Sequence, residues 1–180
     1  EWVERKLEEW RARPLPGRLA LIDGTQLPFL GGTLTLRLAR GSNQAIWSPT
    51  ADRHTVLTLC LRTPAVAPRL LENTLRARAR ECFEARLVFF SARLGLPQPP
   101  LTLSAARTRW GSCNRHGAIR LNWRLIFLPE HLVDYVVAHE VAHLLEMNHG
   151  PRFWQTVGRL YPDYLAARNA LRHVAADIPQ

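Results

Sequence analysis

The stretch Pro129-Glu-His-Leu-Val-Asp-Tyr-Val-Val-Ala-His-Glu-Val-Ala-His143, which continues as Leu-Leu-Glu-Met-Asn-His-Gly-Pro-Arg-Phe-Trp154, decides the fold of this chain. Proline suits the first position of a helix, because its missing N–H would have no partner there. Glu130 and Asp134 suit the positive end of the helix dipole. A broad apolar surface follows, made of Leu132, Val133, Val136, Val137, Val141, Leu144 and Leu145. The stretch therefore predicts a central helix that begins at Pro129.

Two histidines and a glutamate form a His-Glu-x-x-His (HExxH) sequence within this predicted helix. His139 and His143 are four residues apart, which puts them on one helix face, where both can chelate the same ion. Neutral imidazole suits zinc. Glu140 lies about 100° around the helix from His139, beside the metal without having to be a ligand. Such a carboxylate can take a proton from a metal-activated water that attacks a carbonyl.

His149 is the candidate for a third metal ligand. In an unbroken helix it would lie about 9 Å further along the axis than His143, too far to share the ion. The chain must therefore turn back, and Asn148 tolerates the left-handed conformation at a helix end, while Gly150-Pro151 prevents simple continuation. Glu146, three residues past His143, is the rival ligand. We favour His149 because the helix break has no purpose if Glu146 binds the metal.

The region between residues 64 and 125 predicts a long helix followed by a hairpin. The helix spans Pro64 to Leu94 and stops at Gly95. Residues 101–110 and 118–125 then read as two paired strands around a glycine-containing loop. The alternation within residues 118–125 fits a strand at a sheet edge that offers its backbone to an extended peptide, and it also fits an ordinary half-buried strand, which is the commoner case. Further helices follow from Pro151, separated by Tyr-Pro-Asp at residues 161–163.

The first third of the chain has a different texture. Residues 1–13 show helical spacing, and short strand-like segments follow from residue 19 to residue 61. We expect a β-rich segment with a helical start over residues 1–62 and an α+β core over residues 63–180. The length of 180 residues suits one compact unit.

Composition narrows the partners and the compartment. The formal net charge of +9 comes almost entirely from arginine. It fits attraction to nucleic acid such as DNA, or to another polyanion, and it also fits arginines spread over a solvated surface. No apolar run approaches the roughly 18 residues that cross a bilayer, so no membrane contact is expected. Cys60, Cys82 and Cys113 form no CxxC pair. They favour a reducing, cytoplasmic setting over a disulfide framework or a thiolate zinc site.

Four segments in fixed order extend the pattern beyond HExxH, namely Arg109-Trp-Gly-Ser-Cys113, Leu121-Asn-Trp-Arg-Leu125, Tyr135-Val-Val-Ala-His-Glu-Val-Ala-His143 and Met147-Asn-His-Gly-Pro-Arg-Phe-Trp154. From about residue 108 to residue 161 the chain resembles the YgjP-like zinc metallopeptidases, a family related to the SprT and WLM peptidases. The resemblance implies a minimal zincin fold, with a small, mainly antiparallel sheet, a backing helix and an HExxH helix. It also implies a zinc ion held by His139, His143 and His149, with Glu140 as the catalytic base and a protein or peptide as substrate.

Three functions follow from these observations. The leading one is a zinc metalloprotease that hydrolyses peptide bonds with metal-activated water. The second is a nucleic-acid-associated protein with a structural zinc, or, combining the two, a peptidase that acts on DNA-bound proteins. The third is a degenerate binding domain without activity, which is disfavoured because the ligands and the base are all present. For the residue that stabilises the oxyanion, Tyr135, Tyr161 and Tyr164 are unranked candidates, as are nearby arginines.

Overall fold

The computed structural model describes residues 21–50, 52–106 and 108–175, and the helix expected at residues 1–13 lies outside this part. The elements are β1 (Gln26–Phe29), β2 (Gly32–Arg40), β3 (Gln44–Pro49), β4 (His54–Leu61), η1 (Pro64–Val66), α2 (Ala67–Ala92), β5 (Leu101–Ser104), β6 (Gly111–Cys113), β7 (Ile119–Asn122), η2 (Trp123–Phe127), α3 (Glu130–Ala142), α4 (Pro151–Leu160) and α5 (Tyr164–Ala175). Two small sheets and the helices that pack on them confirm the predicted α+β class.

The first sheet has four strands in the order β1-β2-β4-β3. Its centre is the parallel pair β2 and β4, in which Leu36 lies opposite Leu57. The period-2 alternation turns one set of side chains toward the interior, so that Leu34, Leu36, Leu57 and Leu59 are fully buried. This sheet is the β-rich segment expected from the sequence.

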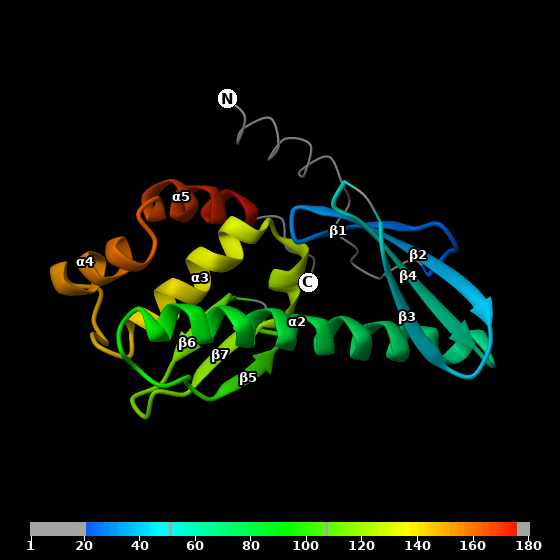
Figure 1. Cartoon of the computed structure of the whole chain (residues 1–180), viewed down its shortest axis with the longest axis horizontal. Helices are drawn as coiled ribbons and strands as arrows, with labels where there is room; N and C mark the ends of the chain where they lie inside the picture. The colour runs from blue at the N-terminus through cyan, green and yellow to red at the C-terminus, as the bar shows by residue number, and fades with distance from the viewer. Residues whose placement is uncertain (1–20, 51, 107, 176–180) are drawn as a thin grey trace.

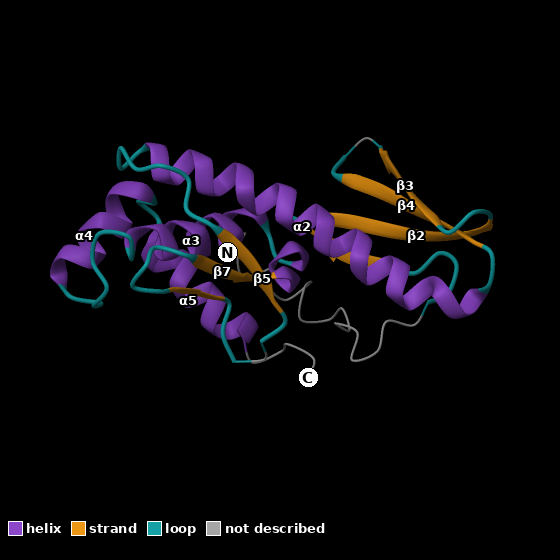
Figure 2. Cartoon of the chain, turned by 90° about the horizontal axis from the view of Figure 1, so that it is seen from below, coloured by secondary structure: helices purple, strands orange, loops and turns teal. Residues whose placement is uncertain are grey.

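Helix α2 connects the two halves of the molecule (Figures 1 and 2), and it contacts strands of both sheets as well as α3. Its buried side is formed by Ala67, Leu71, Leu75, Ala79, Phe83, Leu87, Phe90 and Ser91. Arg86 donates from Nε to Asp134 of α3 at 2.6 Å, which ties the two helices together. Gly95, with a φ of +70°, ends the helix where expected, and Leu96 N–H bonds back to the Ser91 carbonyl.

The second sheet corrects the expected hairpin. Its order is β5-β7-β6, with β7 parallel to β5 and antiparallel to β6. Among the described residues of the predicted strand over residues 101–110, only residues 101–104 form a strand, β5. The antiparallel partner of β7 is β6, which lies in residues 111–113, assigned to the loop by the sequence. The chain crosses from one edge of β7 to the other between β5 and β6. The predicted strand over residues 118–125 ends at Asn122, whose side chain accepts from Arg124 N–H and starts η2. Since β7 is central, the alternative that placed this strand at a sheet edge is wrong; β6 and β5 are the edges.

Helix α3 lies among the second sheet and helices α2, α4 and α5 (Figure 1). Leu132, Val133, Val137, Ala138, Val141 and Ala142 are essentially inaccessible to solvent. Burial on several sides explains why its sequence is apolar nearly all round. The three cysteines are unpaired. In the part of the chain that the structure describes, the helices are too short or too polar to cross a membrane.

Candidate metal centre

Helix α3 carries the HExxH residues near its C-terminal end. Glu140 is 5% exposed and His143 9% exposed, while His139 is partly buried. Polar groups are costly to bury in such a setting unless they share partners or bind a common ion. The helical spacing places His139 and His143 with ring centroids 5.0 Å apart, as the sequence predicts.

The chain reverses direction directly after this helix. The last helical residue is Ala142, and Leu145 and Glu146 donate their N–H groups to its carbonyl, closing a tight turn. Asn148 is not among the residues with positive φ, so the expected left-handed break at that position does not occur. The turn begins earlier than predicted, and α4 begins at Pro151. His149 thereby returns to the end of α3, which an unbroken helix would not allow.

Three imidazoles converge as a result. Each of His139, His143 and His149 offers a nitrogen, and these atoms lie within 4.8 Å of one another. The Nε2 atoms of His139 and His149 are 3.1 Å apart. The Glu146 side chain does not belong to this group, although its backbone carbonyl contributes to it indirectly. Among the described residues, no other cluster of histidine, cysteine or acidic side chains has this geometry.

The protonation states of these histidines suit a metal. His143 Nδ1 lies 3.0 Å from the Glu146 carbonyl oxygen, which only accepts, so Nδ1 carries the hydrogen and Nε2 keeps its lone pair. Burial lowers the pKa of His143. Burial, with help from the neighbouring histidines, lowers the pKa of His139 to about 3. Imidazole nitrogens that gather at one point are the donor set that a borderline-soft cation such as zinc takes, and burial keeps two of these rings neutral.

Phe153 holds the three rings in place, a role that the sequence did not reveal. Its fully buried ring lies 4.9 Å from His139, 4.4 Å from His143 and 4.7 Å from His149, measured between centroids. Trp154 adds a hydrogen bond from Nε1 to the His149 carbonyl at 3.1 Å. The only local signal was that Phe153 follows His149 by four residues, in a helix whose apolar positions read as ordinary core.

Glu140 is an acid without a partner. Burial raises its pKa to about 8, and Oε2 has no hydrogen-bond partner in the structure. Strand β6 packs against it, and a Cβ at Gly111 would lie 2.5 Å from Oε1 and 2.8 Å from Cγ. Glycine is therefore required at position 111 for the strand to approach this carboxyl group. The sequence placed Gly111 in a loop and gave no hint of this contact.

The three tyrosines that are candidates for stabilising the oxyanion differ in how close they lie to the histidines. The Tyr135 ring lies 6.0 Å from the His139 ring. Tyr161 is 6.3 Å from Tyr135, and Tyr164 stacks on Trp154 at 5.5 Å. Tyr135 is thus next to a candidate ligand, whereas Tyr161 and Tyr164 are linked to the cluster through Tyr135 and Trp154.

A buried glutamate beside three convergent imidazoles, on a helix backed by a small sheet, is the arrangement of a metal-dependent hydrolase. The chain belongs to the YgjP-like metallopeptidase family: the family described as "YgjP-like, metallopeptidase domain" matches residues 1–174. A solved structure similar to it is the metallopeptidase zymogen abylysin of Pyrococcus abyssi, at 21% identity, covering 54% of this chain and 96% of that one, with a TM-score of 0.47. No curated protein matches significantly.

Proposed function

We propose that this protein is a zinc-dependent peptidase, in which His139, His143 and His149 bind the metal and Glu140 is the general base. The observation that carries the proposal is the convergence of three imidazoles beside a buried carboxyl group that has no partner. Zinc held by these histidines would supply Lewis acidity and would lower the pKa of an attacking water.

Glu140 performs the proton chemistry in this scheme. Its pKa of about 8 reflects burial alone, and a nearby dication favours the ionised form. The carboxylate then accepts the proton of the attacking water and delivers it to the leaving amine. Gly111 keeps β6 close without a side chain that would push Glu140 aside. The Phe153 ring fixes the imidazoles, so that the groups need little rearrangement during the reaction.

Strand β6 supports a peptide as the substrate. It is an edge strand of the second sheet, and it lies against the helix that carries Glu140. An extended peptide that pairs with such an edge is held by main-chain hydrogen bonds, largely independent of its sequence. The edge that could take a peptide is therefore β6, and not the strand within residues 118–125.

The competing function with a structural zinc is less well supported. A structural site is usually closed by four protein ligands, whereas the described residues supply a group of three. Contact with DNA rests on the net charge of +9 alone and stays a prediction.

Glu140→Gln tests the mechanism. We expect about one zinc per chain in both proteins, and a 10²- to 10⁴-fold lower rate of cleavage of an unfolded protein in the variant, the range typical of general acid–base catalysis. Glu146→Gln is the matched control, and it should retain activity because its side chain lies outside the metal group. Equal rates for Glu140→Gln and the unmodified protein, with zinc bound, would show that the mechanism is wrong.

A further inference from the structure

Helix α5 carries two arginines, Arg168 and Arg172, beside the metal centre. They are four residues apart and share one face of the helix. The Arg168 guanidinium lies 4.4 Å over the Trp154 ring, and that ring is 5.9 Å from His139 and 5.8 Å from His149. Arg168 is therefore one side chain away from the candidate ligands.

The positive charges of Arg168 and Arg172 both act on Tyr135, a neighbour of the candidate ligands. Burial raises the pKa of the Tyr135 hydroxyl, and the charges of Arg168 and Arg172 oppose that rise. Tyr135 precedes His139 by four residues, so it lies on the same face of α3. Both guanidinium groups are therefore close enough to Tyr135 for their charges to act on it, and Tyr135 shares a helix face with the candidate ligand His139.

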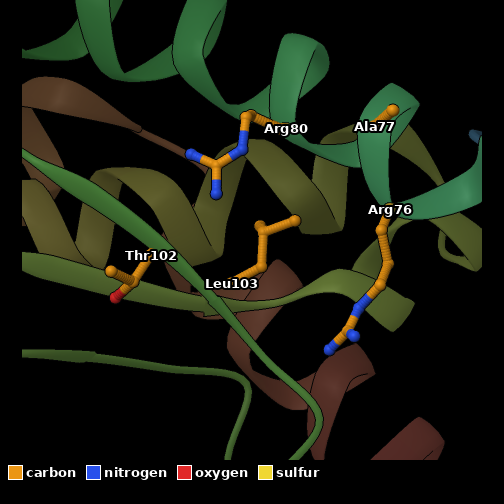
Figure 3. Close-up of a pocket in the computed structure, with 5 residues that line it drawn as sticks. All are labelled: Arg76, Ala77, Arg80, Thr102 and Leu103. Carbon is orange, nitrogen blue, oxygen red and sulfur yellow. The ribbon is translucent and has the colours of Figure 1, made fainter. Parts of the chain in front are cut away.

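Among the described residues, Arg168 and Arg172 have no carboxylate partner, unlike two arginines that line a hollow elsewhere in the molecule. Between α2 and β5, a hollow of about 390 Å³ is lined by Arg76, Ala77, Arg80, Thr102 and Leu103 (Figure 3). There, Arg76 pairs with Glu72 at 3.3 Å and Arg80 with Glu84 at 3.4 Å, so the positive charge is compensated. In the part of the chain that the structure describes, no acidic side chain pairs with Arg168 or Arg172.

Two like charges at this helical spacing disfavour the helix unless an anion joins them. Arginine binds a carboxylate through two parallel hydrogen bonds, and stacking on an indole orients its planar group beforehand. The contact between Arg168 and Trp154 supplies that orientation next to the cleavage centre.

We propose that Arg168, assisted by Arg172, forms a carboxylate-binding subsite that selects peptides with a carboxylate close to the scissile bond. The carboxylate belongs to an aspartate or glutamate side chain, or to the free C-terminus of a peptide cut near its end. The proposal rests on the peptidase function proposed above.

The test uses pairs of peptides with one cleavage site. Each pair has glutamate or glutamine at one position flanking that site, and each peptide is made with a free and with an amidated C-terminus. Turnover is measured with the zinc-loaded protein. Binding is measured by calorimetry with zinc-loaded Glu140→Gln, where cleavage does not interfere. We compare Arg168 with Arg168→Met, which keeps a long stem over Trp154, and with Arg168→Lys, which keeps the charge.

We expect at least a tenfold preference for the carboxylate in kcat/KM and in affinity, the effect of a charge-assisted hydrogen bond. Arg168→Met should lower the ratio to about one, and Arg168→Lys should keep part of it. Arg69→Met, an exposed arginine in the first turn of α2, is the matched control for lost charge and should keep the full ratio. The position that responds, side chain or C-terminus, identifies the source of the carboxylate.

Two results would overturn the subsite: no preference at any position in the unmodified protein, or the same preference in Arg168→Met. Thermal unfolding of Arg168→Met separates a lost subsite from a damaged fold. The binding arm also separates the two proposals. If peptides bind with the expected preference and none is cleaved, the peptidase function fails while the subsite stands.

Discussion

Unusual backbone angles gather at one end of this molecule, and unpartnered buried polar atoms gather at the other. Of the described non-glycine residues with positive φ, all lie in the turns of the four-stranded sheet, namely Leu30, Asn43, Asp52 and Arg53. Of the buried side-chain atoms without a hydrogen-bond partner, all but Arg76 Nε lie beyond residue 101, namely Trp110 Nε1, Trp123 Nε1, His139 Nδ1 and Glu140 Oε2.

The difference distinguishes residues that shape the fold from residues that form the candidate site. Left-handed turn residues cost little and join the sheet's strands compactly. A buried polar atom without a partner costs about 1–3 kcal/mol, so its presence asks for a functional reason. Two of these atoms belong to His139 and Glu140. We infer that the four-stranded sheet is mainly structural. The part of the chain beyond residue 101 contains buried polar groups that lower stability and that serve the candidate site.

Metal removal is the strongest way to test this comparison. At a free zinc concentration about 1,000 times the Kd, bound metal stabilises the folded state by about 4 kcal/mol. We expect a chelator to lower the protection of backbone amides from hydrogen exchange around residues 139–160, because the ion joins the end of α3 to the turn before α4. Backbone amides of β2 and β4 should keep their protection from hydrogen exchange. An equal loss in both regions would break the comparison.

Leu59→Ala tests the opposite half. Leu59 is fully buried in the four-stranded sheet, and its truncation leaves a cavity. The free energy of unfolding should fall by about 3 kcal/mol, measured by denaturant titration. Zinc content should stay at that of the unmodified protein, because no candidate ligand is near. Ile46→Ala in the same sheet is the control; Ile46 is 45% exposed, and its loss should cost about 0.5 kcal/mol or less. Loss of zinc in Leu59→Ala would contradict the separation.

Gly111→Ala should have the smallest effect on stability and a specific effect on activity. The added Cβ meets Glu140 at 2.5–2.8 Å, so the carboxyl group must move. We expect a cost of about 1–2 kcal/mol, with peptidase activity at least tenfold lower and zinc retained. Gly158→Ala is the control, because a Cβ there meets Tyr164 at an ordinary 3.5 Å. Full activity in Gly111→Ala would show that the contact does not position Glu140.

Much of the site could be predicted from local sequence. The spacing of His139, Glu140 and His143 needs only the geometry of one helix, and the Gly-Pro at residues 150–151 marks a chain that stops and turns. The long helix predicted over residues 64–94 is observed over residues 67–92 after a short 3₁₀ turn, and its glycine stop is where expected. Both were readable because the hydrophobic period and the terminators lie within the segment itself. The division of the chain at residue 62 stays a prediction.

The sequence-based predictions were wrong or left open where strand pairing, and not hydrophobic periodicity, decides the structure. The alternation in residues 118–125 is the same for an edge strand and for a central one, and only the position of β5 and β6 on either side of β7 settles which it is. The strand's end at Asn122 depends on a side-chain cap that propensity does not reveal.

By itself, then, the sequence determined the HExxH helix, the reversal toward His149 and the α+β class, because short-range periodicity and the behaviour of proline and glycine dictate them. Only the tertiary structure decided that β6 reaches Glu140 at a glycine, that Phe153 contacts all three imidazoles, and that Arg168 stacks on Trp154 beside them. Those contacts join segments distant along the chain, so they depend on how complete elements pack, which no local pattern encodes.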